Sequence, residues 1–298
     1  MPDFSKRALL IFCADNGVVE EGVSQTGQEV TAAVVSNMTR GRSCSCLMAE
    51  KAETEVFPID MGIACEVEHR GELYPLTERK IRRGTSNFTK AAAMTRQEVL
   101  TAILTGIDAV RVLKEQGYRL SAVGEMGIGN TTTSSAVASV LLQKDPELVT
   151  GAGAGLDSAG LKRRGIGLHH PDPMDGMEVL QKVGGFDLAA MAGAFLGGAI
   201  YHVPVVIDGV IAAAAAAAAG RIAPAATDYM LAAHVSAEPA SIWLLDLIGV
   251  TPAIQAGLRL GEGTGALALF PLLDMALSIY RDMDTFAEME IEEYKPLV

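Results

Sequence analysis

The chain has 298 residues, of which 49% are hydrophobic and 20% are charged, which is typical of a globular protein and not of a disordered one. Its 36 acidic residues outnumber its 24 lysines and arginines, and the formal net charge of −12 argues against a nucleic-acid partner, because phosphate backbones are bound by clustered cations. All four cysteines lie in the first quarter of the chain without a C-x-x-C pair. We therefore expect reduced thiols, a cytoplasmic protein and no structural metal site.

Short apolar runs that end in polar residues recur along the chain. They end at Asp15, at Asp60, at Glu125, at Asp208 and at His234 with Ser236. Runs that are apolar on both faces are typical of buried parallel strands, and ligands of such sheets bind beyond the carboxyl ends of the strands. The pattern predicts an α/β fold: a doubly wound, mostly parallel sheet flanked by helices, with a small helical subdomain from the chain termini. The polar residues are expected to line its ligand crevice.

The longer stretches between these runs predict helices. Residues 28–38, 95–117 and 210–220 have helical patterns, and a glycine, Gly117 or Gly220, is expected to end each of the last two. Cys44 and Cys46 are expected to lie on a further helix as small apolar residues.

One uncharged stretch, residues 188–207, has the length of a membrane span. Because Pro204 lies within it, before a β-branched run, we predict a buried helix followed by a buried strand and no membrane association.

Three remaining segments are polar. Residues 66–95 and 157–180 are predicted to be loops, and the acidic segment 282–298 is predicted to be a surface helix with a frayed end. We expect one domain over residues 1–298. Its large α/β part is expected at about 8–250 and a C-terminal helical part at about 251–298.

Three glycine-rich turns stand out, at residues 124–129, 150–157 and 259–266. In the first, Asn130 and Thr131 follow the glycines at a predicted helix start, where backbone N–H groups and hydroxyls favour an anion. The turn has neither the lysine of a Walker loop nor the dinucleotide-binding spacing. Glu125 and Glu262 lie in two of the turns. By residue type alone, Glu262 fits a functional group and a helix N-terminal carboxylate equally well.

Two histidine patterns are weaker. A metal site at His169–His170 would need Asp172 or Asp175 as a further ligand, and a solvated loop is the simpler interpretation. His234, Ser236 and Glu238 could suggest a catalytic triad, but the chain has no G-x-S-x-G elbow. We predict no metal and no other cofactor.

Eight sequence blocks follow one another in a specific order. They are "FCADNGVVEEGVSQTGQEVT", "KIRRGTSNF", "GEMGIGNTTTSSA", "GAGAGLDSAGL", "VGGFDLAAMAGAFLGG", "PVVIDG", "HVSAEP" and "LRLGEGTGALAL". Together they resemble the signature blocks of the nicotinate-nucleotide–dimethylbenzimidazole phosphoribosyltransferase family over residues 8 to about 287. The resemblance implies transfer of 5-phosphoribose from nicotinate mononucleotide to a benzimidazole, giving α-ribazole phosphate for the lower ligand of cobalamin. It also implies a homodimer that acts on small molecules.

The same resemblance implies site residues. Glu262, in the "LGEG" block, is the candidate general base, and Glu125 matches a second family carboxylate that holds the acceptor or stabilises the ribosyl cation. Gly127, Gly153, Gly155 and Ser236 match the phosphate and nicotinate site, and Ser24 and Gln28 match the benzimidazole pocket. The predicted substrate-binding set is completed by Met126, Asp208, Leu260 and Gly261, and by Asn130 and Thr131 from the anion-site pattern.

The chain departs from the family pattern at three places. Ala152 stands where the family usually has arginine, Gly27 where it has proline, and an N-terminal helical segment common in the family is absent. Two alternatives therefore stay open: the same donor with another acceptor, such as adenine, a phenol or water, or a shortened non-catalytic relative that binds nicotinate or a base. Glu125 and Glu262 favour an enzyme, since a pure binder requires no base.

Overall fold

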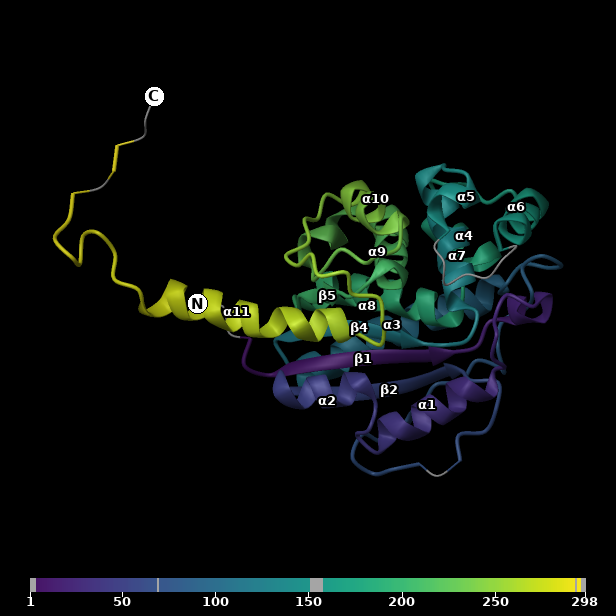
Figure 1. The fold of residues 1–298 in the computed structure, drawn as a ribbon, viewed down its shortest axis with the longest axis horizontal. Coiled ribbons are helices and arrows are strands. Elements are labelled where there is room, and N and C mark those ends of the chain that lie inside the picture. The colour runs from purple at the N-terminus through teal and green to yellow at the C-terminus, as the bar shows by residue number, and fades with distance from the viewer. Residues whose placement is uncertain (1–3, 69, 151–157, 293, 296–298) are drawn as a thin grey trace.

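One parallel sheet organises the protein (Figure 1). The computed structural model describes residues 4–68, 70–150, 158–292, 294 and 295. In sheet order β3-β2-β1-β4-β5-β6, every neighbouring pair is parallel. The strands are β1 (Arg7–Ala14), β2 (Thr54–Gly62), β3 (Thr77–Glu78), β4 (Leu120–Met126), β5 (Val205–Ile207) and β6 (Met230–Ala232). The predicted doubly wound fold is confirmed, and its strand order reverses between β1 and β4, where sheets of this kind bind ligands.

Helices cover both faces of the sheet, which explains why β1 is apolar at nearly every position. Leu9 and Ile11 of β1 pack in one core with helices α1, α2 and α11, whereas Leu10 and Phe12 pack in the other with α3, α8 and α9. These helices are α1 (Glu29–Thr39), α2 (Cys44–Lys51), α3 (Arg96–Glu115), α8 (Phe186–Tyr201), α9 (Val210–Ile222) and α11 (Thr264–Asp282). In Figure 1, α1 and α2 lie below β1, and α8 and α9 lie on its other side.

Three further helices pack against α9: α4 (Asn130–Leu142), α7 (Gly176–Val183) and α10 (Ala240–Leu247) (Figure 1). Helices α5 (Pro146–Val149) and α6 (Ser158–His169) pack against α4. Two short 3-10 helices are η1 (Gly17–Glu21), which follows β1, and η3 (Pro224–Tyr229), which follows α9. The eight alanines at positions 212–219 of α9 are all buried. Alanine favours helix and lets neighbouring helices approach closely, so this run is a packing surface.

Most predicted helix positions are confirmed, but the end predicted for α9 is wrong. Helix α3 begins with a capping box between Thr95 and Glu98 and ends just before Gly117. Helix α9, in contrast, continues past Gly220 to Ile222. It ends because Ala223 precedes Pro224, and a residue before proline favours the extended conformation that Ala223 adopts.

The buried helix and strand predicted within residues 188–207 are confirmed as α8 and β5. Among the described residues, no helix combines the length and the apolar character needed to cross a membrane.

Two other predictions are wrong. The predicted loop at 157–180 contains α6 and most of α7, and α7 begins because the Asp175 side chain accepts a hydrogen bond from the Glu178 N–H. The predicted helix over 282–298 is not formed in its described part, because Met283 is extended and ends α11. The described residues of 66–95 are irregular as predicted, apart from the two-residue β3.

Helix α11 is only partly packed. Its first turns bury Leu267, Leu269 and Phe270 against the sheet, and Arg7 forms an ion pair with Asp274 farther along. Beyond this point the helix projects from the body of the molecule (Figure 1). The division of the chain into a large α/β part and a C-terminal helical part stays a prediction.

Candidate active site

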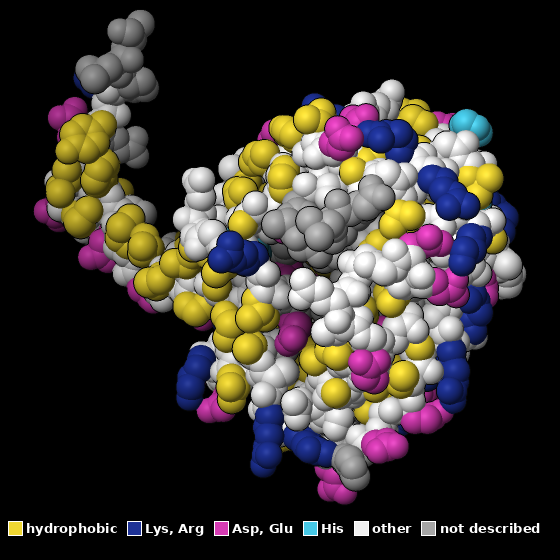
Figure 2. Space-filling view, turned by 45° about the vertical axis from the view of Figure 1, so that its right-hand side comes forward, with side chains coloured by type: hydrophobic (Ala, Val, Ile, Leu, Met, Phe, Trp, Pro, Cys, Tyr) yellow, Lys and Arg dark blue, Asp and Glu magenta, His cyan; other side chains and the backbone are white. Residues whose placement is uncertain are grey.

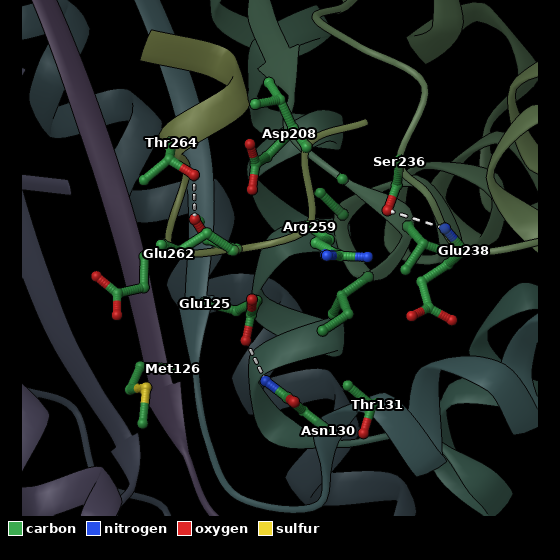
Figure 3. A pocket seen from close by; sticks show the side chains of 18 of the residues that line it. Glu125, Met126, Asn130, Thr131, Asp208, Ser236, Glu238, Arg259, Glu262 and Thr264 are labelled. Carbon is green, nitrogen blue, oxygen red and sulfur yellow. Dashed lines mark hydrogen bonds between the residues drawn. The ribbon is translucent and has the colours of Figure 1, made fainter. Parts of the chain in front are cut away.

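A cavity of about 240 Å³ lies at the carboxyl ends of β4 and β5 (Figure 3). Loops that follow β4, β5 and β6 form its walls together with the turn before α11. The predicted site residues that line it are Glu125, Met126, Gly127, Asn130, Thr131, Asp208, Ser236, Leu260, Gly261 and Glu262. The sheet thus brings together residues that are far apart in the sequence.

Glu125 is the last buried residue of β4. Its carboxylate accepts a hydrogen bond from the side-chain amide of Asn130, the first residue of α4. Burial, followed by the negative charges of Asp187, Asp208 and Glu262, raises the pKa of Glu125 well above its usual value. A cation bound beside this carboxyl group would oppose these effects and favour its ionised form.

The loop from β4 to α4 lies close to other backbone segments. A β-carbon at Gly127 would lie 1.7 Å from the carbonyl oxygen of Ala14, so only glycine fits there. Gly129, at a φ of 93°, is the N-cap of α4. The positive end of the helix is therefore placed at the cavity, beside Asn130 and Thr131.

Arg259 is a cavity residue that the sequence analysis missed. Figure 3 shows its side chain in the cavity between Glu125 and Ser236. A guanidinium group beside a helix N-terminus is suited to bind a phosphate. The other cavity residues that were not predicted as substrate-binding include His234, Glu238, Gly209, Leu258 and Thr264.

Glu262 lies in an unusual turn. Gly261, Glu262 and Gly263 have φ values of 87°, 57° and 80°, which all fall in the left-handed region. Such a conformation costs a non-glycine residue about 1–3 kcal/mol, so surrounding contacts must hold it.

Asp208, which follows β5, supplies these contacts. Its carboxylate accepts hydrogen bonds from the backbone N–H groups of Gly263 at 3.1 Å, Gly265 at 2.7 Å and Ala266 at 3.1 Å. Asp208 thereby caps α11 and fixes the turn that carries Glu262. A direct contact of Asp208 with substrate stays a prediction.

His234 packs beside this cap. Its Nε2 lies 3.7 Å from Oδ1 of Asp208, and both side chains are buried. Burial lowers the pKa of His234, but the interactions with the Asp208 carboxylate and the Val235 backbone outweigh it, and the pKa is raised. Because the ring faces Asp208, we assign His234 to the support of the α11 cap. Ser236 instead accepts a hydrogen bond from the backbone of Glu238.

The side chain of Glu262 points toward α2. Its Oε2 accepts a hydrogen bond from the Ser45 hydroxyl at 3.1 Å. In Figure 3 this carboxylate lies on the side of Met126, away from Arg259. Burial raises the pKa of Glu262, and hydrogen bonds from the Ser45 side chain and backbone only partly offset that increase. The two glutamates therefore face different regions of the site.

Two predicted substrate-binding residues in the described part of the chain, Ser24 and Gln28, do not line the cavity. The hydroxyl of Ser24 accepts a hydrogen bond from the Thr26 N–H, and the Gln28 side chain donates one to the Asn16 carbonyl. The Asn16 N–H in turn donates to Ile128, which lines the cavity, so this segment adjoins the site. Gly153 and Gly155 lie outside the described residues.

Two strand-end aspartates also lie outside the lining, so the expectation that all the strand ends line one crevice is wrong for them. Asp15 accepts hydrogen bonds from the Thr31 hydroxyl at 2.6 Å and the Ala64 N–H at 2.8 Å. Asp60 accepts one from the Ile63 N–H. Both carboxylates hold loops together. Within the described ranges, no group of three or more His, Cys, Asp or Glu side chains is arranged to hold a metal ion.

Comparison with known proteins agrees with this geometry. A family model described as phosphoribosyltransferase matches residues 1–291. A nicotinate-nucleotide–dimethylbenzimidazole phosphoribosyltransferase of Clostridium acetobutylicum is 44% identical over 302 residues, covering 99% of this chain and 85% of the relative. One from Escherichia coli O1:K1 is 40% identical, covering 98% and 82%. The crystal structure of the enzyme of that name from Thermus thermophilus is 37% identical, with a TM-score of 0.89 over 98% of this chain and 88% of the other.

The parallel sheet, the cavity near its reversal point and the family match define a phosphoribosyltransferase with an α/β fold. The protein is thus an enzyme of the transferase class. More narrowly, the chain belongs to the nicotinate-nucleotide–dimethylbenzimidazole phosphoribosyltransferase family, which confirms the resemblance of its sequence blocks.

Proposed function

We propose that the protein transfers 5-phosphoribose from nicotinate mononucleotide to 5,6-dimethylbenzimidazole or a related base, giving α-ribazole 5′-phosphate and nicotinate. Family membership supports this reaction. The observation that carries it is the cavity lined by Glu125 and Glu262, from two separate glycine-rich turns, together with Arg259 and the start of α4.

The chemistry of the donor makes few demands on the protein. Nicotinate is a pyridinium in its mononucleotide, so when the bond from C1′ to the ring nitrogen breaks, the electron pair neutralises that nitrogen. The leaving group then needs no proton. The acceptor nitrogen forms its bond to C1′ from the opposite face, which inverts the configuration to α. Holding both substrates in line supplies much of the rate enhancement.

The donor fits the side of the cavity that contains Glu125. We assign its phosphate to Arg259 and to the start of α4 at Asn130 and Thr131, where positive charge and hydroxyl groups gather. Glu125 then faces the pyridinium and the ribosyl carbon. Positive charge there lowers the pKa of this carboxyl group and favours the anion that stabilises the transition state.

The acceptor is assigned to the side of Glu262 and Met126, with Ser24 and Gln28 as a further wall. As the azole bonds to C1′, its N–H proton passes to the carboxylate of Glu262 and then to solvent. General-base help of this kind contributes about 10²–10⁴-fold to the rate.

The test is to incubate the protein with nicotinate mononucleotide and a panel of acceptors, and to follow nicotinate by chromatography. Benzimidazoles, adenine, a phenol and no added base form the panel. Release that depends on a benzimidazole, with formation of the α-nucleotide, is expected. Release of nicotinate with adenine, a phenol or water alone would identify that compound as the acceptor in place of a benzimidazole. If no nicotinate is released with any of them, the result would favour a non-catalytic binder.

We also propose a homodimer in the cytoplasm. Four large apolar side chains are exposed along one side of α11 and its C-cap, at Leu272, Met275, Ile279 and Met283. Figure 2 shows hydrophobic side chains along this projecting segment. A stripe of this length would be covered by the same surface of a second copy, as in a two-fold interface. The free cysteines support a reducing compartment.

A further inference from the structure

Ser45 lies beneath Glu262 at the start of α2. Ser43 is the N-cap of this helix and accepts the Cys46 N–H at 3.2 Å, which places the Ser45 hydroxyl and N–H at the helix N-terminus. The hydroxyl donates a hydrogen bond to the Glu262 carboxylate at 3.1 Å. Ser45 is fully buried, although it is 217 residues from its partner in the sequence.

We propose that Ser45 is a positioning residue for Glu262: its hydroxyl holds the carboxylate in the direction in which it accepts the proton of the azole. This inference rests on the proposed function, in which Glu262 is the general base.

The direction of the carboxylate follows from two restraints. The backbone of Glu262 is fixed by its left-handed turn and by the cap that Asp208 forms on the following residues. The side chain could still rotate, and Ser45 removes that freedom. A carboxylate has about four acceptor positions, so the hydroxyl of Ser45 leaves room for the azole N–H.

The ionised form also depends on Ser45. The titratable groups that face Glu262 from the packed elements are Asp208 after β5, Glu125 on β4 and Cys46 on α2, and each is neutral or negative. Burial and the charge of Asp208 raise the pKa of Glu262, whereas the Ser45 hydrogen bonds lower it. Without the hydroxyl the pKa of Glu262 would rise further, so that at a given pH more of the base would be protonated and unable to take a proton.

The test compares Ser45→Ala with the parent protein by the pH dependence of kcat at saturating donor and acceptor. A hydrogen bond to a charged group corresponds to about one pH unit or more, so the acid limb is expected to move upward by about one unit. In the acid limb kcat then falls about tenfold. The KM for nicotinate mononucleotide is expected to stay within about twofold, because the donor lies on the other side of the site.

Three further measurements isolate the Ser45 hydroxyl. Ser45→Thr keeps it and is expected to restore the parental profile. Leu47→Ala, at an exposed position of the same helix, is expected to leave the acid limb unmoved. The pH profiles are recorded with two benzimidazoles of different basicity. If protonation of the acceptor set the acid limb, the limb would lie at a different pH for each benzimidazole. If Ser45→Ala does not fold, Ser45→Cys, a weaker donor of similar size, takes its place with the same expectation.

The outcomes distinguish the inference from the reaction. An unmoved acid limb in the Ser45 variant, or an equal shift in Leu47→Ala, would overturn the role of Ser45 alone, provided that Glu262→Gln is severely impaired. A Glu262→Gln protein with full activity would overturn both the assignment of Glu262 as the general base and the positioning role of Ser45.

Discussion

Gly124 on β4 lies directly against the backbone of Glu262: a β-carbon at position 124 would come within 2.6 Å of the Glu262 carbonyl carbon. The strand and the turn before α11 therefore touch without an intervening side chain. This contact sets how far the carboxylate at 262 stands from the end of β4.

We expect Gly124→Ala to displace the turn and to lower kcat by about tenfold or more, since misplacement of about 1 Å can cost 10²-fold. Steady-state release of nicotinate measures the effect. Gly167→Ala is the matched control, because a β-carbon added at Gly167 in α6 would meet no other atom within 4 Å, and alanine favours helix. Equal rates in the two variants would show that the contact is unimportant.

Replacing Glu262 by glutamine is expected to lower kcat by about 10²–10⁴-fold, because the amide cannot accept the azole proton. Its carbonyl oxygen can still accept the Ser45 hydrogen bond, so the turn should keep its position. Calorimetry should show donor affinity within about twofold of the parent. A variant that turns over at the parental rate would eliminate Glu262 as the base.

Arg259→Ala is expected to raise the KM for nicotinate mononucleotide by about 10–100-fold, the loss of one hydrogen bond between charged groups. Nicotinate riboside, which lacks the phosphate, provides the control. The parent and the variant should use the riboside equally well. A similar loss with both donors would place the guanidinium away from the phosphate.

Asp187, at the start of α8, gives the fold a pH dependence. Burial raises its pKa from 3.8 to about 7. Because the folded value exceeds the unfolded one, this contribution to stability is complete below pH 3.8 and is lost as the pH rises through about 7. From pH 5 to 8 the parent should lose about 2–3 kcal/mol of unfolding free energy through this group. In Asp187→Asn, the loss of unfolding free energy from pH 5 to 8 should be smaller by that amount when measured by urea titration. An equal loss in the parent and the variant would contradict the role of Asp187.

Ile279→Glu is expected to convert the homodimer to a monomer, because it places a charge within the apolar stripe of α11. Sedimentation velocity measures the change. Ser278→Glu adds the same charge beside the stripe and should leave the dimer intact. A parent protein that sediments as a monomer would reject the dimer.

The sheet could be predicted because the local pattern and the tertiary structure agree. The run from Arg7 to Ala14 is apolar on both faces, and both faces are covered by helices. Helices α6 and α7 were missed because their helical periodicity is interrupted by "HHPDPMDG", and the start of α7 depends on a hydrogen bond between Asp175 and Glu178. The end of α9 depended on Pro224, not on Gly220.

The candidate site was predictable where a local motif marks it. Glu125 and Glu262 stand in glycine-rich turns, and both line the cavity. Arg259 begins the third glycine-rich turn, but nothing in the local pattern shows that its side chain enters the cavity. Ser45 carries no such signal, and it reaches Glu262 only after α2 and α11 pack on the same face of the sheet. Contacts of this kind depend on tertiary structure and have no counterpart in residue spacing.

Asp208 links the end of β5 to the first residues of α11 by hydrogen bonds, so the turn that carries Glu262 is fixed to the sheet. Ser24 and Gln28 instead belong to the irregular segment that precedes α1. Divergence in that segment could change which base is accepted while the proton acceptor stays in place. Directed evolution of acceptor preference should therefore begin at residues 22–28, where substitutions leave the sheet and the turn that carries Glu262 undisturbed.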